Sequence, residues 1–272
     1  MDVLTGFQAM EANLRQSFRV LAQGRPHAAI AELDGVSIAS LGAAFQMFNA
    51  AFLSREVSGP EDLESRLYAA RQVFDSRRIP WSFWVCDEWL PRSVRRDLIR
   101  ICESFGLRAV TEMPGMVADS LRDMGRFSLF SRPAQELEIR RADNVQTMND
   151  FRAVGSLCFH VPPAWFGEVF DDTIPSREFR CWVGYQEGRP VATAATVVSH
   201  DVIGLYNVGA IPGEQKKGFG EAITRRAIGE AVNESGLRRV ILQSTWQGER
   251  LYRKLGFREV SRLVVFNSVT AV

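Results

Sequence analysis

The sequence has no run of about 18 apolar residues, the minimum for a membrane-spanning helix, and no apolar segment typical of a signal peptide near its start. It also has little net charge, because 33 basic residues almost balance 32 acidic ones and leave a formal charge of +1. A general attraction to nucleic acid is therefore not expected, and any anion binding must be local. We expect a cytoplasmic protein that has no membrane partner and no nucleic-acid partner.

Cysteine and histidine are scarce as well. The chain has three histidines, and its four cysteines lie far apart, without the paired spacing of a zinc site. We therefore expect reduced thiols in the core and no bound metal. The cysteines are Cys86, Cys102, Cys158 and Cys181.

The rest of the composition is that of an ordinary globular protein, with 46% hydrophobic and 24% charged residues among 272. This length suits one large domain or two of common size. The polar segment 131–136 separates the apolar residues 127–130 from a new strand-like start at Leu137. It predicts a boundary between a domain of residues 1–134 and a domain of residues 135–272.

The apolar pattern of the second domain predicts an α/β fold with a mixed sheet, of the α+β type. Alternating residues indicate strands, and apolar residues three or four apart indicate helices. Helices alternate with strands only in part, which argues against a doubly wound sheet. The expected strands are 137–141, 179–186, 190–199, 202–211, 239–244 and a final hairpin of 257–260 with 263–267. The expected helices are 145–158, 164–170, 220–235 and 248–255.

The first domain has a vaguer pattern. The aromatic run at 81–84 indicates a buried strand, and a row of arginines on one helix indicates a solvated face. The segment 104–107 is similar to 254–257, which indicates either an internal repeat or only the usual form of a helix–Gly–strand turn. The expected helices are 11–21, 61–77 and 91–105, and the expected strands are 81–87 and 107–111. The arginines are Arg92, Arg95, Arg96 and Arg100.

The most informative segment lies between the strand that ends near Ile211 and the helix that begins near Phe219. It reads Gln215-Lys216-Lys217-Gly218-Phe219-Gly220 and follows a turn at Pro212-Gly213. Glycine lets the backbone approach a ligand, and the free N–H groups of a helix's first turn, together with the helix dipole, favour an anion. Two lysines add positive charge. The loop therefore predicts a phosphate-binding site.

This loop resembles the Gln/Arg-x-x-Gly-x-Gly/Ala signature of the GNAT N-acetyltransferase superfamily. Further along, Leu251-Tyr252-Arg253-Lys254-Leu255-Gly256-Phe257 is similar to the family's Leu-Tyr-x-Lys-Leu-Gly-Phe segment, and the elements between the two motifs follow the family's order. The resemblance covers residues 137–272 and implies a GNAT-like fold there. The first half has no such loop, so the whole chain resembles a tandem arrangement whose N-terminal half is a degenerate GNAT-like domain that helps to shape the acceptor site.

The resemblance also implies a reaction. Acetyl-CoA, or another acyl-CoA, is the expected co-substrate, and the acceptor is a primary amine of a small molecule or an amino-acid-like compound. Loop amides are expected to hold the pyrophosphate, and the backbone around Val208 and Ala210 to position the thioester. Direct transfer is expected, because neither motif contains a cysteine. The expected cofactor-binding residues are Val208, Ala210, Gln215, Lys216, Lys217, Gly218, Phe219, Gly220 and Thr245.

Tyr252 and Asn207 are the expected catalytic residues. The leaving thiolate needs a proton, which Tyr252 can donate, unless this tyrosine is only a packed aromatic. The chain departs from the family pattern twice, because strand residues 203–209 include no acid and Thr245 stands where the family often has Asn. Asn207 either orients the amine or a water, or is a β-bulge residue. Thr245 either binds the pantetheine or caps the following helix.

Several features are left open. Residues 162–166 contain two aromatic side chains, Trp165 and Phe166, that either line an acceptor pocket or staple a lid helix, and residues 113–116 suggest a turn. The alternative function is a non-catalytic acyl-CoA-binding or regulatory protein, and the chain is either a monomer or a homodimer. The general base is unassigned, and the candidates, each of which has a purely structural or solvated alternative, are His160, Glu168, Asp171 and Asp172.

Overall fold

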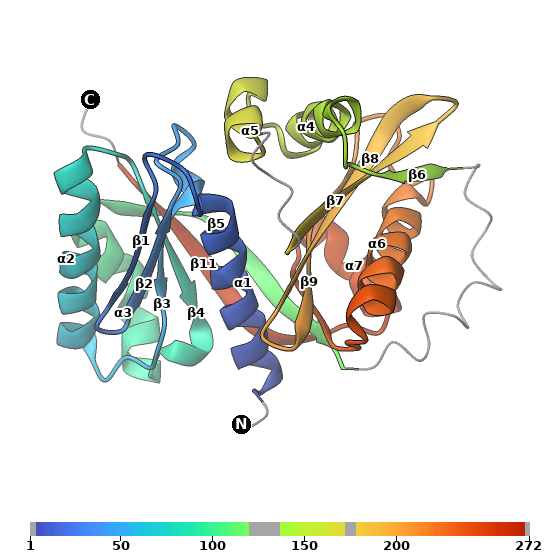
Figure 1. Cartoon of the computed structure of the whole chain (residues 1–272). Coiled ribbons are helices and arrows are strands. Elements are labelled where there is room, and N and C mark those ends of the chain that lie inside the picture. The colour runs from blue at the N-terminus through green and yellow to red at the C-terminus, as the bar shows by residue number, and fades with distance from the viewer. Residues whose placement is uncertain (1–3, 120–136, 172–177, 270–272) are drawn as a thin grey trace. The chain divides into compact units, whose positions relative to one another are not determined.

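The computed structural model describes residues 4–119, 137–171 and 178–269 (Figure 1). The chain forms two compact units, each built from two separate stretches of sequence. The domain boundary predicted at 134/135 and its linker, 131–136, lie outside the described residues. Unit 1 comprises Met1–Ser17 and Met116–Arg258, and unit 2 comprises Phe18–Gly115 and Glu259–Val272.

The sheet of unit 1 has the strand order β6-β7-β8-β9-β10, and the end of β5 follows β10. Neighbouring strands are antiparallel from β6 to β9, whereas β9 and β10 are parallel. The mixed sheet and the predicted hairpin are therefore confirmed. The strands are β6 (Glu138–Arg141), β7 (Phe179–Gln186), β8 (Arg189–Ser199), β9 (Val202–Ala210) and β10 (Val240–Gln243).

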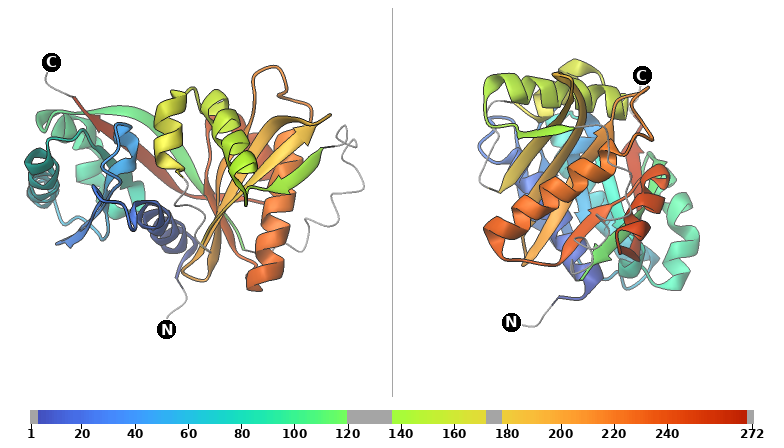
Figure 2. Two further views of the ribbon diagram at one scale, coloured as in Figure 1. Left: turned by 45° about the horizontal axis from the view of Figure 1, so that its top comes forward. Right: turned by 90° about the vertical axis from the view of Figure 1, so that its right-hand side faces the viewer.

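Four helices of unit 1 follow its strands in the expected order. Helix α4 begins at a capping box, in which Asn144 and Thr147 each bond the other's backbone. Helix α6 begins and ends at glycines in the left-handed region, Gly218 and Gly236. Helices α4 and α6 lie on opposite faces of the sheet (Figure 2). The bounds are Val145–Phe159 for α4, Pro163–Val169 for α5, Phe219–Ser235 for α6 and Trp246–Lys254 for α7.

Each face of this sheet buries its own apolar layer. On the α6 side, Ile203 and Leu205 of β9 belong to a buried cluster that includes the apolar side chains of α6. On the α4 side, four phenylalanines pack together, Phe151, Phe166, Phe170 and Phe179. The apolar spacing predicted for α4 holds only in its middle, because Val145 and Leu157 at its ends are 70% and 56% exposed.

Unit 2 has the strand order β1-β2-β3-β4-β11-β5. Strands β1, β2 and β3 are antiparallel neighbours, and β3 and β4 are parallel. Helix α2 buries Leu63, Leu67 and Phe74 against this sheet, and the Phe74 ring stacks on Trp81 with centroids 4.9 Å apart. Helix α1 (Gly6–Ala22) runs from unit 1 into unit 2. The other bounds are β1 (Ala29–Leu33), β2 (Val36–Ser40), β3 (Asn49–Leu53), α2 (Pro60–Arg77), β4 (Ser82–Cys86), α3 (Arg92–Ser104), β5 (Leu107–Ala118) and β11 (Arg258–Ser268), with 3₁₀ turns at Gln46–Phe48 and Asp87–Trp89.

Two sequence predictions are wrong in unit 2, and strands β1, β2 and β3 were not predicted at all. The predicted turn at 113–116 is part of β5, and the predicted final hairpin is the single strand β11. The polar residues 261 and 262 look like a turn in the sequence, but Ser261 is buried and donates a hydrogen bond to Glu88, so the strand continues through it. The buried strand at 81–84 and the solvated arginine face of α3 are confirmed.

The two units repeat one order of elements. In each, an antiparallel hairpin leads to a third antiparallel strand, a helix, and a strand parallel to the third. The pattern is β1-β2-β3-α2-β4 in unit 2 and β7-β8-β9-α6-β10 in unit 1. The next helices, α3 and α7, both end before a glycine with positive φ, Gly106 and Gly256. The similarity of segments 104–107 and 254–257 therefore reflects equivalent positions in a repeated fold.

Two other properties bear on function. Within residues 4–119, 137–171 and 178–269, every helix is too short or too polar to cross a membrane. None of the four cysteines forms a disulfide bond, and Cys86, Cys102 and Cys181 are buried as expected. Burial raises the pKa of the Cys102 and Cys158 thiols to about 12, so both are protonated near neutral pH.

Candidate active site

The predicted phosphate loop joins β9 to α6 on the surface of unit 1. Its backbone is left-handed at Gly213, Lys216 and Gly218, with φ values of 86°, 63° and 90°. Gly218 is the residue before the first turn of α6, and no side chain caps this helix end. The N–H groups of a helix's first turn have no carbonyl partner within the helix. The loop therefore has the form that the sequence predicted for an anion cradle.

An ion-pair network braces this loop from one side. Glu214 is only 8% exposed, and its carboxylate accepts hydrogen bonds from Lys217, at 2.6 Å, and from Arg189. The bond from Lys217, supported by Arg189, holds the pKa of Glu214 below its usual range. The sequence prediction treated Lys217 as added positive charge, but its amine is paired here. Lys216 is exposed.

The strand before the loop contains a β-bulge at Asn207. Its φ is 50°, and the pairing of β8 with β9 shifts by one residue there. The Thr193 hydroxyl donates to the Asn207 carbonyl at 3.0 Å and fixes the irregularity. A bulge turns the backbone groups that follow it out of the regular ladder. Those residues include Val208 and Ala210, the two positions expected to contact the thioester arm.

Helix α4 packs closely on the far end of this bulge. A Cβ atom at Gly209 would lie 2.8 Å from Cβ and 3.0 Å from Sγ of Cys158, and 3.6 Å from the Phe159 ring. Only glycine therefore lets α4 approach β9 so closely. The sequence predicted Cys158 only as a core thiol and did not single out Phe159, because the contact joins residues far apart in the chain.

Tyr252 lies on α7 and is 7% exposed. Its ring meets Phe257 edge to face, with centroids 5.7 Å apart, and belongs to the buried cluster beside α6. Burial raises the pKa of the phenol, and the nearby Thr224 hydroxyl of α6 only partly opposes this rise. The phenol therefore holds its proton at neutral pH. Both readings of the sequence, a packed aromatic and a proton donor, agree with this environment.

Thr245 caps helix α7. Its hydroxyl oxygen accepts the Gly248 N–H at 3.2 Å, which is the capping alternative of the sequence prediction. The same turn is crowded, because a Cβ at Gly248 would lie 3.1 Å from both the Ser244 hydroxyl and the Tyr252 ring. The cap thus fixes the start of the helix that positions Tyr252.

The four candidates for the general base come from helices α4 and α5 and the residues that follow them. His160 ends α4 in a left-handed conformation and is exposed, and Glu168 on α5 is exposed as well. Asp171 follows α5, and Asp172 lies outside the described residues. Phe166 of α5 packs against Gly155 of α4, which agrees with the structural alternative that this side chain attaches the lid helix. Trp165, in contrast, is 40% exposed. In the part of the chain that the structure describes, no three His, Cys, Asp or Glu side chains gather to hold a metal ion.

Known proteins share parts of this architecture. Residues 177–259 match the family described as "Acetyltransferase (GNAT) domain". That range contains the bulged strand, the loop, α6 and Tyr252. A comparison with curated proteins finds no match at a significant level.

Solved structures extend the likeness to the whole chain. A GCN5-related N-acetyltransferase from Kribbella flavida aligns over 97% of this chain and 96% of its own, with a TM-score of 0.69 and 17% identity. One from Sphaerobacter thermophilus aligns over 86% and 76%, with a TM-score of 0.58 and 16% identity. A tandem GNAT protein from the clavulanic acid biosynthesis pathway aligns over 98% and 95%, with a TM-score of 0.53 and 10% identity. At such identities the likeness concerns the fold, which is GNAT-like and tandem in arrangement.

Proposed function

We propose that the protein is an acetyl-CoA-dependent N-acyltransferase. The premise is that this chain has a tandem GNAT fold and that residues 177–259 form its GNAT acetyltransferase domain. The acceptor in this proposal is a primary amine of a small molecule or an amino-acid-like compound, and the acetyl group moves to it directly. The observation that supports the proposal is the uncapped start of α6, which follows a bulged strand and the loop 211–218 and shares a buried apolar cluster with Tyr252.

The proposed donor site uses the loop before α6 and the end of β9. In the proposal, the backbone N–H groups of Lys217, Gly218, Phe219 and Gly220 bind the diphosphate, with Gln215 and Lys216 at the rim. A Cβ at Gly220 would meet nothing closer than the Leu251 side chain at 3.9 Å, so the backbone is open on that side. The backbone of Val208 and Ala210 holds the pantetheine arm, and Thr245 contributes through its capping hydroxyl.

Acetyl-CoA supplies an activated acetyl thioester. The amine nitrogen attacks the carbonyl carbon, the C–S bond breaks, and the sulfur takes a proton that Tyr252 donates. Asn207, which has its carbonyl fixed by Thr193, directs its amide to the incoming amine in this account. The amine must arrive uncharged, and its surplus proton passes to water or to a base that the described residues do not identify. Cys158 takes no part, because its raised pKa keeps the thiol protonated.

A loop variant tests donor binding. Gly220→Val adds a branched side chain to the proposed diphosphate loop, and its Cβ meets no protein atom closer than the Leu251 side chain at 3.9 Å. We expect the Kd for acetyl-CoA, measured by calorimetry, to rise at least about 10-fold, which corresponds to about 1.4 kcal/mol. Gly229→Val is the matched control, because Gly229 lies on the same helix and also has open space around it. Equal affinity of the two variants would exclude this loop as the donor site.

A second variant separates the two readings of Asn207. Asn207→Gly retains the positive φ at no steric cost and removes only the amide. If the amide orients the amine, kcat/KM for the acceptor falls about 10-fold, a loss of about 1.4 kcal/mol in transition-state stabilisation, while the Kd for acetyl-CoA is unchanged. Unchanged kcat/KM would show that Asn207 serves the bulge alone. Asn207→Val, which strains the same φ, is expected to impair both quantities.

A non-catalytic acyl-CoA-binding protein is the second candidate. It is favoured by the lack of an acid in 203–209 and by the use of Thr245 as a helix cap. Thiol release, followed with a thiol reagent over a panel of primary amines, separates the two. Release that depends on the amine supports the transferase, and saturable binding with no release supports the binding protein.

A further inference from the structure

Helix α2 of unit 2 corresponds to helix α6 of unit 1. Each helix follows the third strand of an antiparallel group and leads to a strand parallel to it. The loop 54–59 before α2 therefore corresponds to the loop 211–218 before α6. If unit 2 had kept a second donor site, the start of α2 would hold its diphosphate.

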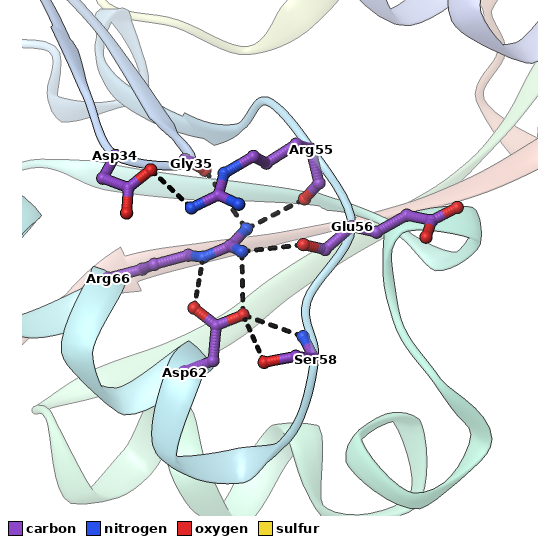
Figure 3. Close-up of polar contacts among 7 residues, drawn as sticks. All are labelled: Asp34, Gly35, Arg55, Glu56, Ser58, Asp62 and Arg66. Carbon is purple, nitrogen blue, oxygen red and sulfur yellow. Dashed lines mark hydrogen bonds and ion pairs between the residues drawn. The ribbon is translucent and has the colours of Figure 1, made fainter.

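At the start of α2, a carboxylate of the chain itself already takes a backbone N–H donor of the loop (Figure 3). Asp62 lies in the first turn and accepts hydrogen bonds from the Ser58 N–H at 2.8 Å and the Ser58 hydroxyl at 3.1 Å. Pro60 opens the helix and has no N–H to offer, and Glu61 adds a second negative charge in the same turn. This end of the helix thus has fewer donors than α6 and an anion in place.

Arg66 locks this carboxylate and the loop together. It is 3% exposed and donates to both Asp62 oxygens, at 2.8 Å each. It also donates to the carbonyls of Arg55 at 2.9 Å and Glu56 at 2.7 Å, so the loop wraps around the guanidinium. Gly35, with φ 75°, makes room for it, because a Cβ there would lie 2.5 Å from Cζ of Arg66.

We propose that the Asp62 carboxylate, held by Arg66, fills in unit 2 the place that a diphosphate takes in unit 1, and that unit 2 consequently binds no acyl-CoA. The inference rests on the proposed function only for the comparison with unit 1. A diphosphate at α2 would have to displace a carboxylate that accepts two hydrogen bonds from Ser58 and two from Arg66, and it would lie beside Glu61. The tandem chain then has one donor site, and unit 2 has a structural lock where the other would be.

Chemical rescue tests the occupant directly. Asp62→Ala leaves a buried guanidinium without its anion, so we expect Tm to fall by roughly 10 °C or more. Added formate, a small carboxylate, is expected to restore part of that loss. Asp75→Ala is the matched control, because Asp75 pairs with Arg71 on the same helix but both side chains are about half exposed. Its Tm is expected to change little and not to respond to formate. A stable Asp62→Ala, or one that formate does not rescue, would overturn the proposal.

If Asp62→Ala does not fold, a titration of the wild-type protein still tests whether α2 binds a diphosphate. Amide chemical shifts are followed during titration with acetyl-CoA and, separately, with inorganic diphosphate. We expect saturable shifts at 217–220 and none at Ser58, Gly59, Glu61 or Asp62. Saturable shifts at these four residues would overturn the inference and leave the proposed function intact. If neither segment responds, the proposed donor site fails, whereas the closed state of α2 is supported.

Discussion

Tyr252→Phe is expected to lower kcat about 100-fold and to leave the Kd for acetyl-CoA unchanged. General acid catalysis of this kind contributes about 10²–10⁴-fold, and the substitution removes only the hydroxyl that delivers the proton. The ring and its edge-to-face contact with Phe257 remain, so the fold is preserved. The measurement is steady-state turnover of a responsive amine, with donor affinity taken from calorimetry.

Two comparisons make this prediction specific. Tyr185→Phe is the matched control, because Tyr185 is also buried and also has a raised pKa, but its hydroxyl bonds Asp150 instead of facing the α6 side. Its kcat is expected to stay within about twofold, and any loss to appear in stability. A donor with a more acidic thiol needs less protonation on leaving, so the defect of Tyr252→Phe is expected to shrink with it. An equal defect with both donors would contradict the role of Tyr252 as the acid.

The pH dependence follows from the direction of the pKa shift. Tyr252 donates a proton only in its neutral form, and burial moves the pKa of the phenol above its ordinary value of about 10. The Tyr252 contribution is therefore complete below pH 10 and is lost only above it. Any rise of activity between pH 7 and 9, where an amine acceptor loses its proton, belongs to the acceptor or the base.

Arg66→Met is expected to destabilise unit 2 by about 3 kcal/mol, the lower end of the usual effect of breaking a buried charge pair, because the Asp62 side chain is 25% exposed and water can solvate part of its charge. The change leaves the Asp62 carboxylate without its cation and the carbonyls of Arg55 and Glu56 without donors. Denaturant unfolding gives the free energy, and hydrogen exchange along α2 localises the loss. Arg71→Met, on the exposed Arg71–Asp75 pair, is expected to cost no more than about 0.5 kcal/mol. Equal losses for the two variants would refute a special role for Arg66.

The same pair predicts an acid effect. Burial alone would raise the pKa of Asp62, but the hydrogen bonds from the Ser58 backbone and from Arg66 outweigh it and lower the pKa. The pKa of Asp62 in the folded protein thus lies below its pKa in the unfolded chain, which is about 3.9. Its contribution to stability is complete above that pH and is lost as the pH falls through the folded value. Wild type is expected to lose more stability than Arg66→Met over that acid range.

Local patterns made much of unit 1 predictable. The loop at 215–220, the helix that follows and the hairpin at 179–199 depend on glycine positions and short-range periodicity, and all three are present. Unit 2 was harder to predict. Strands β1, β2 and β3 are short and rich in alanine and serine, and β11 passes through a polar pair because Ser261 finds Glu88 in another element. Partners distant in the chain decided these elements.

Some features of the candidate site were likewise predictable from local sequence, whereas others depend on the fold. The positive φ values of Gly218 and Asn207 agree with sequence patterns, whereas the pairing of Glu214 with Arg189 and Lys217 requires the fold. The Arg66–Asp62 ion pair is the clearest case of a feature that depends on the fold. In the sequence its spacing looks like an ordinary surface pair, and only the approach of the loop buries Arg66.

The central claim is that this chain moves an acetyl group from acetyl-CoA to an amine. The most direct test incubates the purified protein with acetyl-CoA labelled in its acetyl carbons and a panel of primary amines, and then measures labelled amide by mass spectrometry together with free CoA thiol. We expect labelled amide and thiol in equal amounts with at least one amine class, and strongly reduced formation with Gly220→Val. Saturable binding of acetyl-CoA with no labelled amide from any amine would contradict it.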